Sequence, residues 1–162
     1  MMAQAPSVRT VADPDERAAL CRTILSDLPE WFGRPDAVER YADDARHLTT
    51  FSIGATSDGA ALGFACLCAA TSDAFDLHVI GVRGDTQRSG LGQALVEACA
   101  AHARERSARY LTVRTIGPSR DDPNYAATRA FYVACGFVGV AEFADHWGRG
   151  MPMLLMLRSL AT

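Results

Sequence analysis

The stretch Gln87-Arg88-Ser89-Gly90-Leu91-Gly92 combines two glycines with the expected start of a helix. It follows an apolar run, residues 75–82, that predicts a strand, and it opens a segment, residues 90–106, that predicts a long helix. A strand that turns through glycines into a helix leaves backbone N–H groups unpaired beside the positive end of the helix dipole. Such a turn suits phosphate binding, and an ordinary glycine turn before a helix is the alternative. The spacing matches neither a Walker-type phosphate loop nor a dinucleotide-binding turn.

A second stretch, residues 127–137, has the sequence Ala-Thr-Arg-Ala-Phe-Tyr-Val-Ala-Cys-Gly-Phe. Together the two stretches resemble the GCN5-related N-acetyltransferase (GNAT) superfamily. The pyrophosphate loop of that family reads Gln/Arg-x-x-Gly-x-Gly/Ala, and a later helix ends in Phe/Leu-Tyr-x-x-x-Gly-Phe. Both motifs occur here in order, with a strand-like run at 110–116 between them. The resemblance extends over nearly the whole chain and is firmest over residues 60–140, so we expect a single domain over residues 1–162.

The resemblance implies an α/β (α+β) fold, with a mixed, mostly antiparallel central sheet of about seven strands flanked by about four helices. The residue pattern places strands at 8–11, 48–55, 61–71, 75–82, 110–116, 137–143 and 151–157. It places helices at 14–28, 35–46, 90–106 and 125–135. The first helix has a strong start, with Asp13 as N-cap and Pro14 at the first helical position. A turn with the Asp-Gly pair is expected at 56–59.

The resemblance also implies acetyl-CoA as the acyl donor. Its pyrophosphate would bind the backbone N–H groups of Gln87, Arg88, Ser89, Gly90, Leu91 and Gly92. Arg88 would add positive charge at the rim, although an ordinary solvated arginine is an equal alternative. The pantetheine arm would pair with the backbone of Ile80, Gly81 and Val82 like an added strand.

Tyr132 occupies the position of the family's usual general acid, which protonates the leaving thiolate and lies against the cofactor. A phenol with an ordinary pKa of about 10 is protonated at neutral pH, as a donor must be. A core tyrosine on a helix face is the alternative. The asparagine that often begins this motif falls one residue early, at Asn124, which puts its contact with the cofactor in doubt. Cys135 is a conceivable acyl carrier, but helix geometry and the family's direct transfer favour packing.

Asp76 and His78 are the candidates for the base that deprotonates the acceptor. They lie two positions apart on the predicted strand and therefore face the same side. By the resemblance, some family members carry a glutamate at the position of Asp76. A histidine of pKa about 6.5 accepts a proton directly, whereas an aspartate of about 3.9 needs burial or a water relay. We expect the two to act as a pair, directly or through a water molecule. A structural contact, or the absence of any dedicated base, are the alternatives.

The expected acceptor is a primary amine of a small molecule. Six acids against two arginines between Ser26 and Ala45 fit an aminoglycoside-like or polyamine-like compound, although such a run is more often a solvated face. A protein or peptide amine, and a regulatory module that binds acyl-CoA without transfer, are the alternatives; retention of Tyr132 argues against the second. The candidate acceptor contacts are Trp31, Phe32, Glu142, His146 and Trp147.

Composition narrows the function further. The chain of 162 residues has 49% apolar residues and a net charge of −3, which argues against a nucleic-acid partner. No apolar run approaches the roughly 18 residues of a membrane helix, and the start does not resemble a signal peptide, so we expect a cytoplasmic protein. Five scattered cysteines lack zinc-ligand spacing, which predicts buried, reduced thiols and no metal. A homodimer is compatible with the family, which often forms dimers.

Overall fold

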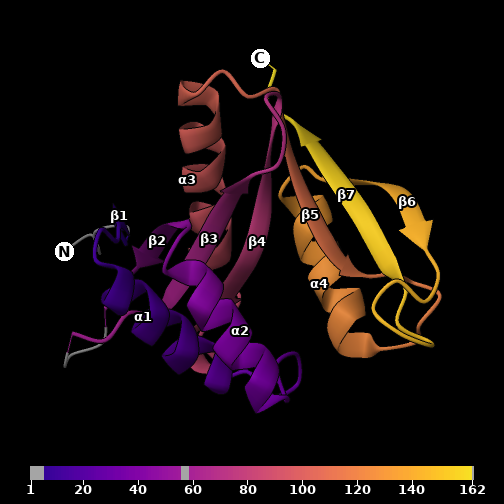
Figure 1. Cartoon of the computed structure of the whole chain (residues 1–162), viewed down its shortest axis with the longest axis horizontal. Helices are drawn as coiled ribbons and strands as arrows, with labels where there is room; N and C mark the ends of the chain where they lie inside the picture. The colour runs from indigo at the N-terminus through magenta and orange to yellow at the C-terminus, as the bar shows by residue number, and fades with distance from the viewer. Residues whose placement is uncertain (1–5, 56–58, 162) are drawn as a thin grey trace. The chain divides into compact units, whose positions relative to one another are not determined.

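The computed structural model describes residues 6–55 and 59–161. Within them lies a seven-stranded sheet of order β1-β2-β3-β4-β5-β7-β6, mixed and mostly antiparallel, with four α-helices (Figure 1). The strands are β1 Val8–Thr10, β2 Thr49–Ile53, β3 Gly63–Ala69, β4 Ala74–Val82, β5 Tyr110–Ile116, β6 Val138–Phe143 and β7 Met153–Ser159. The helices are α1 Pro14–Ser26, α2 Pro35–Ala45, α3 Leu91–Glu105 and α4 Pro123–Ala134, with a short 3-10 turn at Gly84–Thr86. The predicted fold class is confirmed, and the predicted turn at 56–59 lies largely outside the described residues.

The chain divides into two compact units. The first unit comprises residues 1–68 and 79–99, and the second comprises residues 69–78 and 100–162. The first therefore holds β1, β2, most of β3, the end of β4 and most of α3, together with α1 and α2. The second holds the start of β4, the end of α3, and β5, α4, β6 and β7.

In the first unit, α1 and α2 lie side by side, as Figure 1 shows. The α1 helix begins as predicted, because the Asp13 side chain accepts a hydrogen bond from the Asp15 N–H at 3.0 Å and Pro14 follows the cap. Buried residues of both helices and of the sheet pack together in one core. The helices contribute Ala18, Cys21, Ile24, Leu25, Val38, Ala42 and Ala45, and the strands contribute Phe64, Cys66 and Val79. Gly81 allows this close approach, since an added Cβ would lie 3.0 Å from Ile24 Cγ2.

In the second unit, β5 is central. It pairs antiparallel with β7 from Tyr110↔Ser159 to Ile116↔Met153, and parallel with β4 from Ala74↔Tyr110 to Leu77↔Val113. Strand β6 pairs antiparallel with the other edge of β7. This arrangement fixes which side chains of β4 and β5 become neighbours.

The α4 helix begins two residues earlier than the sequence pattern predicted. Asp122 is its N-cap and accepts a hydrogen bond from the Asn124 N–H at 2.9 Å. Pro123 occupies the first helical position, where a proline loses no helical hydrogen bond. The prediction was wrong because it assigned this proline to the preceding loop. Asn124 therefore lies inside the first turn of the helix.

Candidate active site

The predicted phosphate loop belongs to the first unit. Its residues up to Gly90 are exposed. Gln87 is extended, whereas Arg88 has a φ of 66° and Gly90 a φ of 86°. The first helical hydrogen bond of α3 runs from the Ala94 N–H to the Gly90 carbonyl at 3.1 Å. The N–H groups of residues 91–93 precede that bond and have no acceptor within the helix, so donors gather where the loop meets α3.

This loop geometry fits a pyrophosphate. A Cβ added at Gly90 would meet no atom within 4 Å, so the glycine is not required by packing. It is required by the positive φ, and its missing side chain lets a ligand approach the backbone. Arg88 adopts the left-handed region without being a glycine, which costs on the order of 1 kcal/mol and is a feature that collects at ligand sites. Ser89 Oγ donates to the Thr86 carbonyl and fixes the turn.

The end of β4 holds the residues that are predicted to pair with the pantetheine arm. The ladder between β4 and β5 covers only Ala74–Leu77. Ile80, Gly81 and Val82 follow these paired residues on β4. Whether these residues pair with the arm stays a prediction.

Asp76 has partners other than the predicted one. Its carboxylate is buried in the second unit, where Thr112 Oγ1 donates to Oδ1 at 2.8 Å and Arg114 Nη2 donates to Oδ2 at 3.1 Å. Both oxygens are therefore engaged, and neither contacts His78. His78 is half-buried two residues further along β4. The parallel register places Thr112 opposite Asp76. Whether Asp76 and His78 act together through water stays a prediction.

Tyr132 is buried in the second unit, with 6% of its surface exposed. Its ring contacts Phe131 and Phe137, with centroid distances of 5.4 and 5.7 Å. These contacts hold the phenol rigidly on α4. They suit both a positioned general acid and a packed core residue, so the role of Tyr132 stays a prediction.

The comparisons with known proteins begin with a family model. Residues 17–137, which span both motifs, match the model of the acetyltransferase (GNAT) family. The chain belongs to the GNAT family of acetyltransferases. It is therefore an acetyl-CoA-dependent acetyltransferase. The alternative of a regulatory module without transfer is not supported.

Solved structures share the fold of this acetyltransferase. A protein from Desulfovibrio desulfuricans that is assigned to the GNAT family is 25% identical, with a TM-score of 0.82 over 97% of this chain and 100% of that one. An aminoglycoside 6'-N-acetyltransferase bound to coenzyme A is 12% identical, with a TM-score of 0.73 over 96% and 98%. An Escherichia coli N-acetyltransferase for an alanine of a ribosomal protein is 20% identical, with a TM-score of 0.73 over 97% and 95%. No curated protein matches the sequence.

The predicted acceptor contacts of the acetyltransferase fall into both units. In the first unit, Trp31 and Phe32 are half-buried against the helical core, and the Phe32 ring lies edge-on to Tyr41. In the second unit, Glu142 Oε1 accepts hydrogen bonds from the Ser119 N–H and hydroxyl, which engage one of the two carboxylate oxygens.

His146 and Trp147 lie on the connection between β6 and β7, with 5.5 Å between their ring centroids. His146 also contacts Phe143 at 6.4 Å. Trp147 is 46% exposed. The three rings form an exposed aromatic group, and aromatic faces attract ammonium ions.

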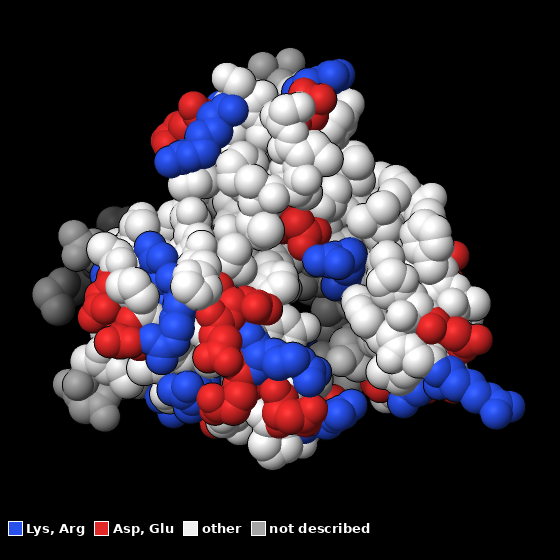
Figure 2. All heavy atoms as spheres, in the orientation of Figure 1, with Lys and Arg blue, Asp and Glu red and all other residues white. Residues whose placement is uncertain are grey.

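Two acids of the acidic segment, Glu39 and Asp36, form ion pairs with arginines. Glu39 on α2 accepts two hydrogen bonds from Arg22 on α1, at 2.7 and 3.0 Å. Asp36 forms ion pairs with Arg34 and Arg40. Figure 2 shows acidic and basic side chains interleaved over α1 and α2 rather than separated. The interpretation as a solvated, salt-bridged face therefore fits better than an acidic field that attracts a cation.

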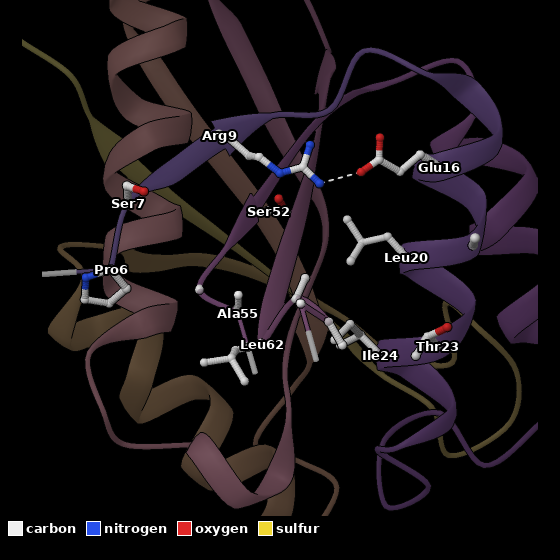
Figure 3. Close-up of a pocket in the computed structure, with 15 residues that line it drawn as sticks. Pro6, Ser7, Arg9, Glu16, Leu20, Thr23, Ile24, Ser52, Ala55 and Leu62 are labelled. Carbon is white, nitrogen blue, oxygen red and sulfur yellow. Dashed lines mark hydrogen bonds and ion pairs between the residues drawn. The ribbon is translucent and has the colours of Figure 1, made fainter. Parts of the chain in front are cut away.

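A pocket of about 820 Å³ lies elsewhere in the first unit. It is bounded by β1, α1 and the residues that flank the ends of β2 and β3, and Figure 3 shows Leu20, Ile24 and Leu62 around it. The ion pair between Arg9 and Glu16 lies at one side. None of its lining residues belongs to the predicted site.

Two absences concern only residues 6–55 and 59–161. No helix there is long and apolar enough to span a membrane. No group of three or more histidine, cysteine or acidic side chains there is arranged to hold a metal ion.

Sequence reasoning missed Thr112 and Arg114. The sequence does indicate that Thr112 and Arg114 share one face of the strand, because they are two positions apart in a strand-like run. Their meeting with Asp76 depends on the parallel register of β4 and β5, which no local pattern encodes.

Proposed function

We infer that the enzyme transfers the acetyl group of acetyl-CoA directly to a primary amine of a small molecule. The observation that carries the donor side is the exposed loop at 87–90, whose two left-handed residues lead into the N-terminus of α3. Backbone donors at this position suit a pyrophosphate, and no lysine is needed.

The chemistry requires one bond to form and one to break. The neutral amine nitrogen attacks the thioester carbonyl carbon, the C–S bond breaks, and the thiolate takes a proton. We assign proton donation to the Tyr132 phenol and acceptance of the ammonium proton to His78, directly or through water. Asp76 is less suited to the second task, because its two oxygens already accept hydrogen bonds.

Direct transfer is supported by the state of the thiols. Four of the five cysteines, Cys21, Cys66, Cys99 and Cys135, are buried and Cys68 is half-buried, which agrees with the prediction of mostly buried thiols. Burial raises the pKa of the Cys66 thiol to about 11 and that of Cys99 to about 12, and it raises the pKa of Cys21 as well. An acyl-carrying cysteine instead needs a lowered pKa and access to the donor. These thiols therefore fit packing, and acetyl transfer in a ternary complex accounts for the reaction better.

The aromatic group of Phe143, His146 and Trp147 supports an amine acceptor. The paired acids of α1 and α2 give little support to a polycation such as an aminoglycoside. Similarity of fold does not decide the matter, since the solved neighbours named above include enzymes for an aminoglycoside and for a protein.

The first experiment measures thiol release from acetyl-CoA with a panel of amines: amino acids, amino amides, polyamines, aminoglycosides and short peptides. Turnover confined to small amines supports the proposal, and turnover confined to peptides contradicts it. Tyr132→Phe should reduce kcat about 10²- to 10⁴-fold while the Kd of CoA stays within about twofold. Tyr125→Phe, on the same helix, is the matched control and should behave as wild type. An unchanged kcat in Tyr132→Phe removes the general-acid assignment.

A substitution in the loop tests whether the loop binds the pyrophosphate of acetyl-CoA. Gly90→Val places a branched side chain at a left-handed position where the pyrophosphate is expected, so the Kd of CoA should rise at least about tenfold. Gly84→Ala is the control, because a Cβ there also meets no atom within 4 Å but the residue has no positive φ. Equal CoA affinity in both variants would contradict the assignment of the loop.

A further inference from the structure

Arg114 is held in place by a buried acid. The Asp76 side chain is 10% exposed, whereas the Arg114 side chain is 45% exposed. A buried carboxylate is costly unless charge and hydrogen bonds compensate it, and Thr112 and Arg114 supply both. The two partners differ in exposure, because the Asp76 carboxylate is enclosed and the Arg114 guanidinium reaches the surface. Asp76 therefore acts as a positioning residue for Arg114.

Most donors of Arg114 remain available. Within residues 6–55 and 59–161, its hydrogen bond to Asp76 uses one Nη2 donor, and its Nε and Nη1 atoms make none. A guanidinium presents its N–H groups in a planar fork that matches a carboxylate. The ion pair with Asp76 restricts a flexible side chain in advance, which lowers the entropy lost when an anion binds.

The position of Arg114 connects it with the candidate base. The ladder of β4 and β5 ends at Leu77↔Val113, so His78 and Arg114 are the first residues after it on the two strands. On the other side of β5, Arg114 lies opposite Leu155 of β7, which is half-buried. A cation with an apolar neighbour thus follows the end of the ladder by one residue, as does His78, the residue assigned to deprotonate the acceptor.

We propose that Arg114 forms an anion subsite for the acceptor, which is an amine that also carries a carboxylate, as an amino acid does. This rests on the proposed function and narrows it. The carboxylate binds the free edge of the guanidinium, and the amine is thereby held near His78.

The test uses the full-length enzyme and pairs of probes that differ only in the anion, namely amino acids and the matching amino amides. Wild type should prefer the acid in kcat/KM by about 10- to 100-fold, the effect of one charge-assisted contact. Arg114→Gln should reduce this preference to about twofold or less without changing the KM of acetyl-CoA, and Arg114→Lys should keep part of it. Arg109→Gln removes an exposed arginine of the same unit and should leave the preference unchanged.

A double variant that removes both charges of the pair serves as the control for misfolding. Asp76→Asn with Arg114→Gln removes both charges together and leaves no uncompensated carboxylate, so the double variant should fold and still lack the acid preference. Thermal unfolding of each variant checks this. Equal use of acids and amides by wild type overturns the subsite but leaves acetyl transfer intact. Retention of the acid preference in a folded Arg114→Gln also overturns it.

If the enzyme turns over none of these probes, a binding measurement tests the subsite instead. Titration of the CoA-saturated protein with the same amino acids should show carboxylate-dependent binding in wild type that weakens about tenfold or more in Arg114→Gln. That result supports the subsite while the missing turnover counts against the proposed function. Absence of carboxylate-dependent binding in wild type overturns the subsite.

Discussion

Arginine pairs the acids of the first unit and the buried acid of the second unit in opposite ways. On α1 and α2, Glu39 and Arg22 are both exposed, with side-chain exposures of 54% and 42%. In the second unit, the Asp76 side chain is 10% exposed beneath Arg114. Exposed pairs contribute little to stability and are screened by salt, whereas breaking a buried pair leaves a charge without solvent. The pair with two hydrogen bonds, Arg22 and Glu39, is therefore expected to matter less for stability than the pair with one, Arg114 and Asp76.

The comparison also concerns function. A run of acids in a sequence predicts a negative electrostatic field, but two acids of this run, Glu39 and Asp36, form ion pairs with nearby arginines. A lone aspartate in a strand attracts less attention, yet it positions a half-exposed cation. The number of charges in a segment is thus a weaker guide to a ligand than the burial of each partner.

The largest expected effect breaks the buried pair from its exposed side. Arg114→Leu leaves the Asp76 carboxylate enclosed with only Thr112 as a partner, so the free energy of unfolding should fall by about 2–4 kcal/mol. Urea denaturation measures it. Arg109→Leu, at an exposed arginine, should cost less than about 1 kcal/mol. If the two variants cost the same, the Asp76 carboxylate is hydrated in solution and the two kinds of pair are not distinct.

A smaller loss is expected when the same pair is broken from its buried side. Asp76→Asn keeps an oxygen that accepts from Thr112, and the cation left behind is half-exposed and can be hydrated. The free energy of unfolding should fall by about 1–2 kcal/mol, again by urea denaturation. If Asp76→Asn lowered the free energy of unfolding more than Arg114→Leu does, the exposed partner would be the costlier one to leave unpaired. The positioning role of Asp76 would then lose its basis.

Local signals explain what the sequence predicted well. The N-cap Asp13 with Pro14, and the apolar spacing of α3, depend on neighbouring residues, and both helices were located within two residues. The start of α4 was missed because Pro123 is equally common in a loop and at a first helical position. Gly90 was identified as a special backbone position, whereas the left-handed conformation of Arg88 was not, since no residue preference signals it.

Non-local features explain what the sequence could not predict. The loop and Tyr132 were found because each belongs to a continuous motif. The partners of Asp76 come from another strand, and their identity follows from the register that ends at Leu77↔Val113. The pairing of Glu39 with Arg22 likewise requires the packing of α1 on α2. One-dimensional patterns therefore supplied the candidate residues of the site but not which of them meet.

His102 offers a third kind of charge, on an imidazole that is half-buried. It lies in the last turn of α3 in the second unit, with its ring edge-on to Phe75. Burial and the nearby Arg106 cation lower its pKa from the ordinary 6.5. Because the unfolded chain then binds a proton more readily than the folded protein, stability should decrease as pH falls through about 6.5.

The measurement is thermal unfolding from about pH 7.5 to about pH 5.5. His102→Gln cannot titrate and should lose less stability over this range than wild type, and His47→Gln, at an exposed position of the first unit, should follow wild type. An identical pH dependence in all three proteins would show that His102 is hydrated. The half-buried cation would then behave like the exposed charges of α1 and α2.

The smallest effect is expected at the exposed pair. Its hydrogen bonds with Arg22 hold the pKa of Glu39 below the usual range, so the contribution of the pair is present above about pH 4.5 and is lost as pH falls through the lowered value. Glu39→Gln should lower Tm by about 1 °C or less at about 0.1 M salt, and by less at about 1 M. A double-mutant cycle with Arg22→Gln isolates the pair. If the coupling energy between Arg22 and Glu39 stayed the same at high salt, α1 and α2 would shield this pair from solvent. The pair would then resemble the buried pair of Asp76 and Arg114.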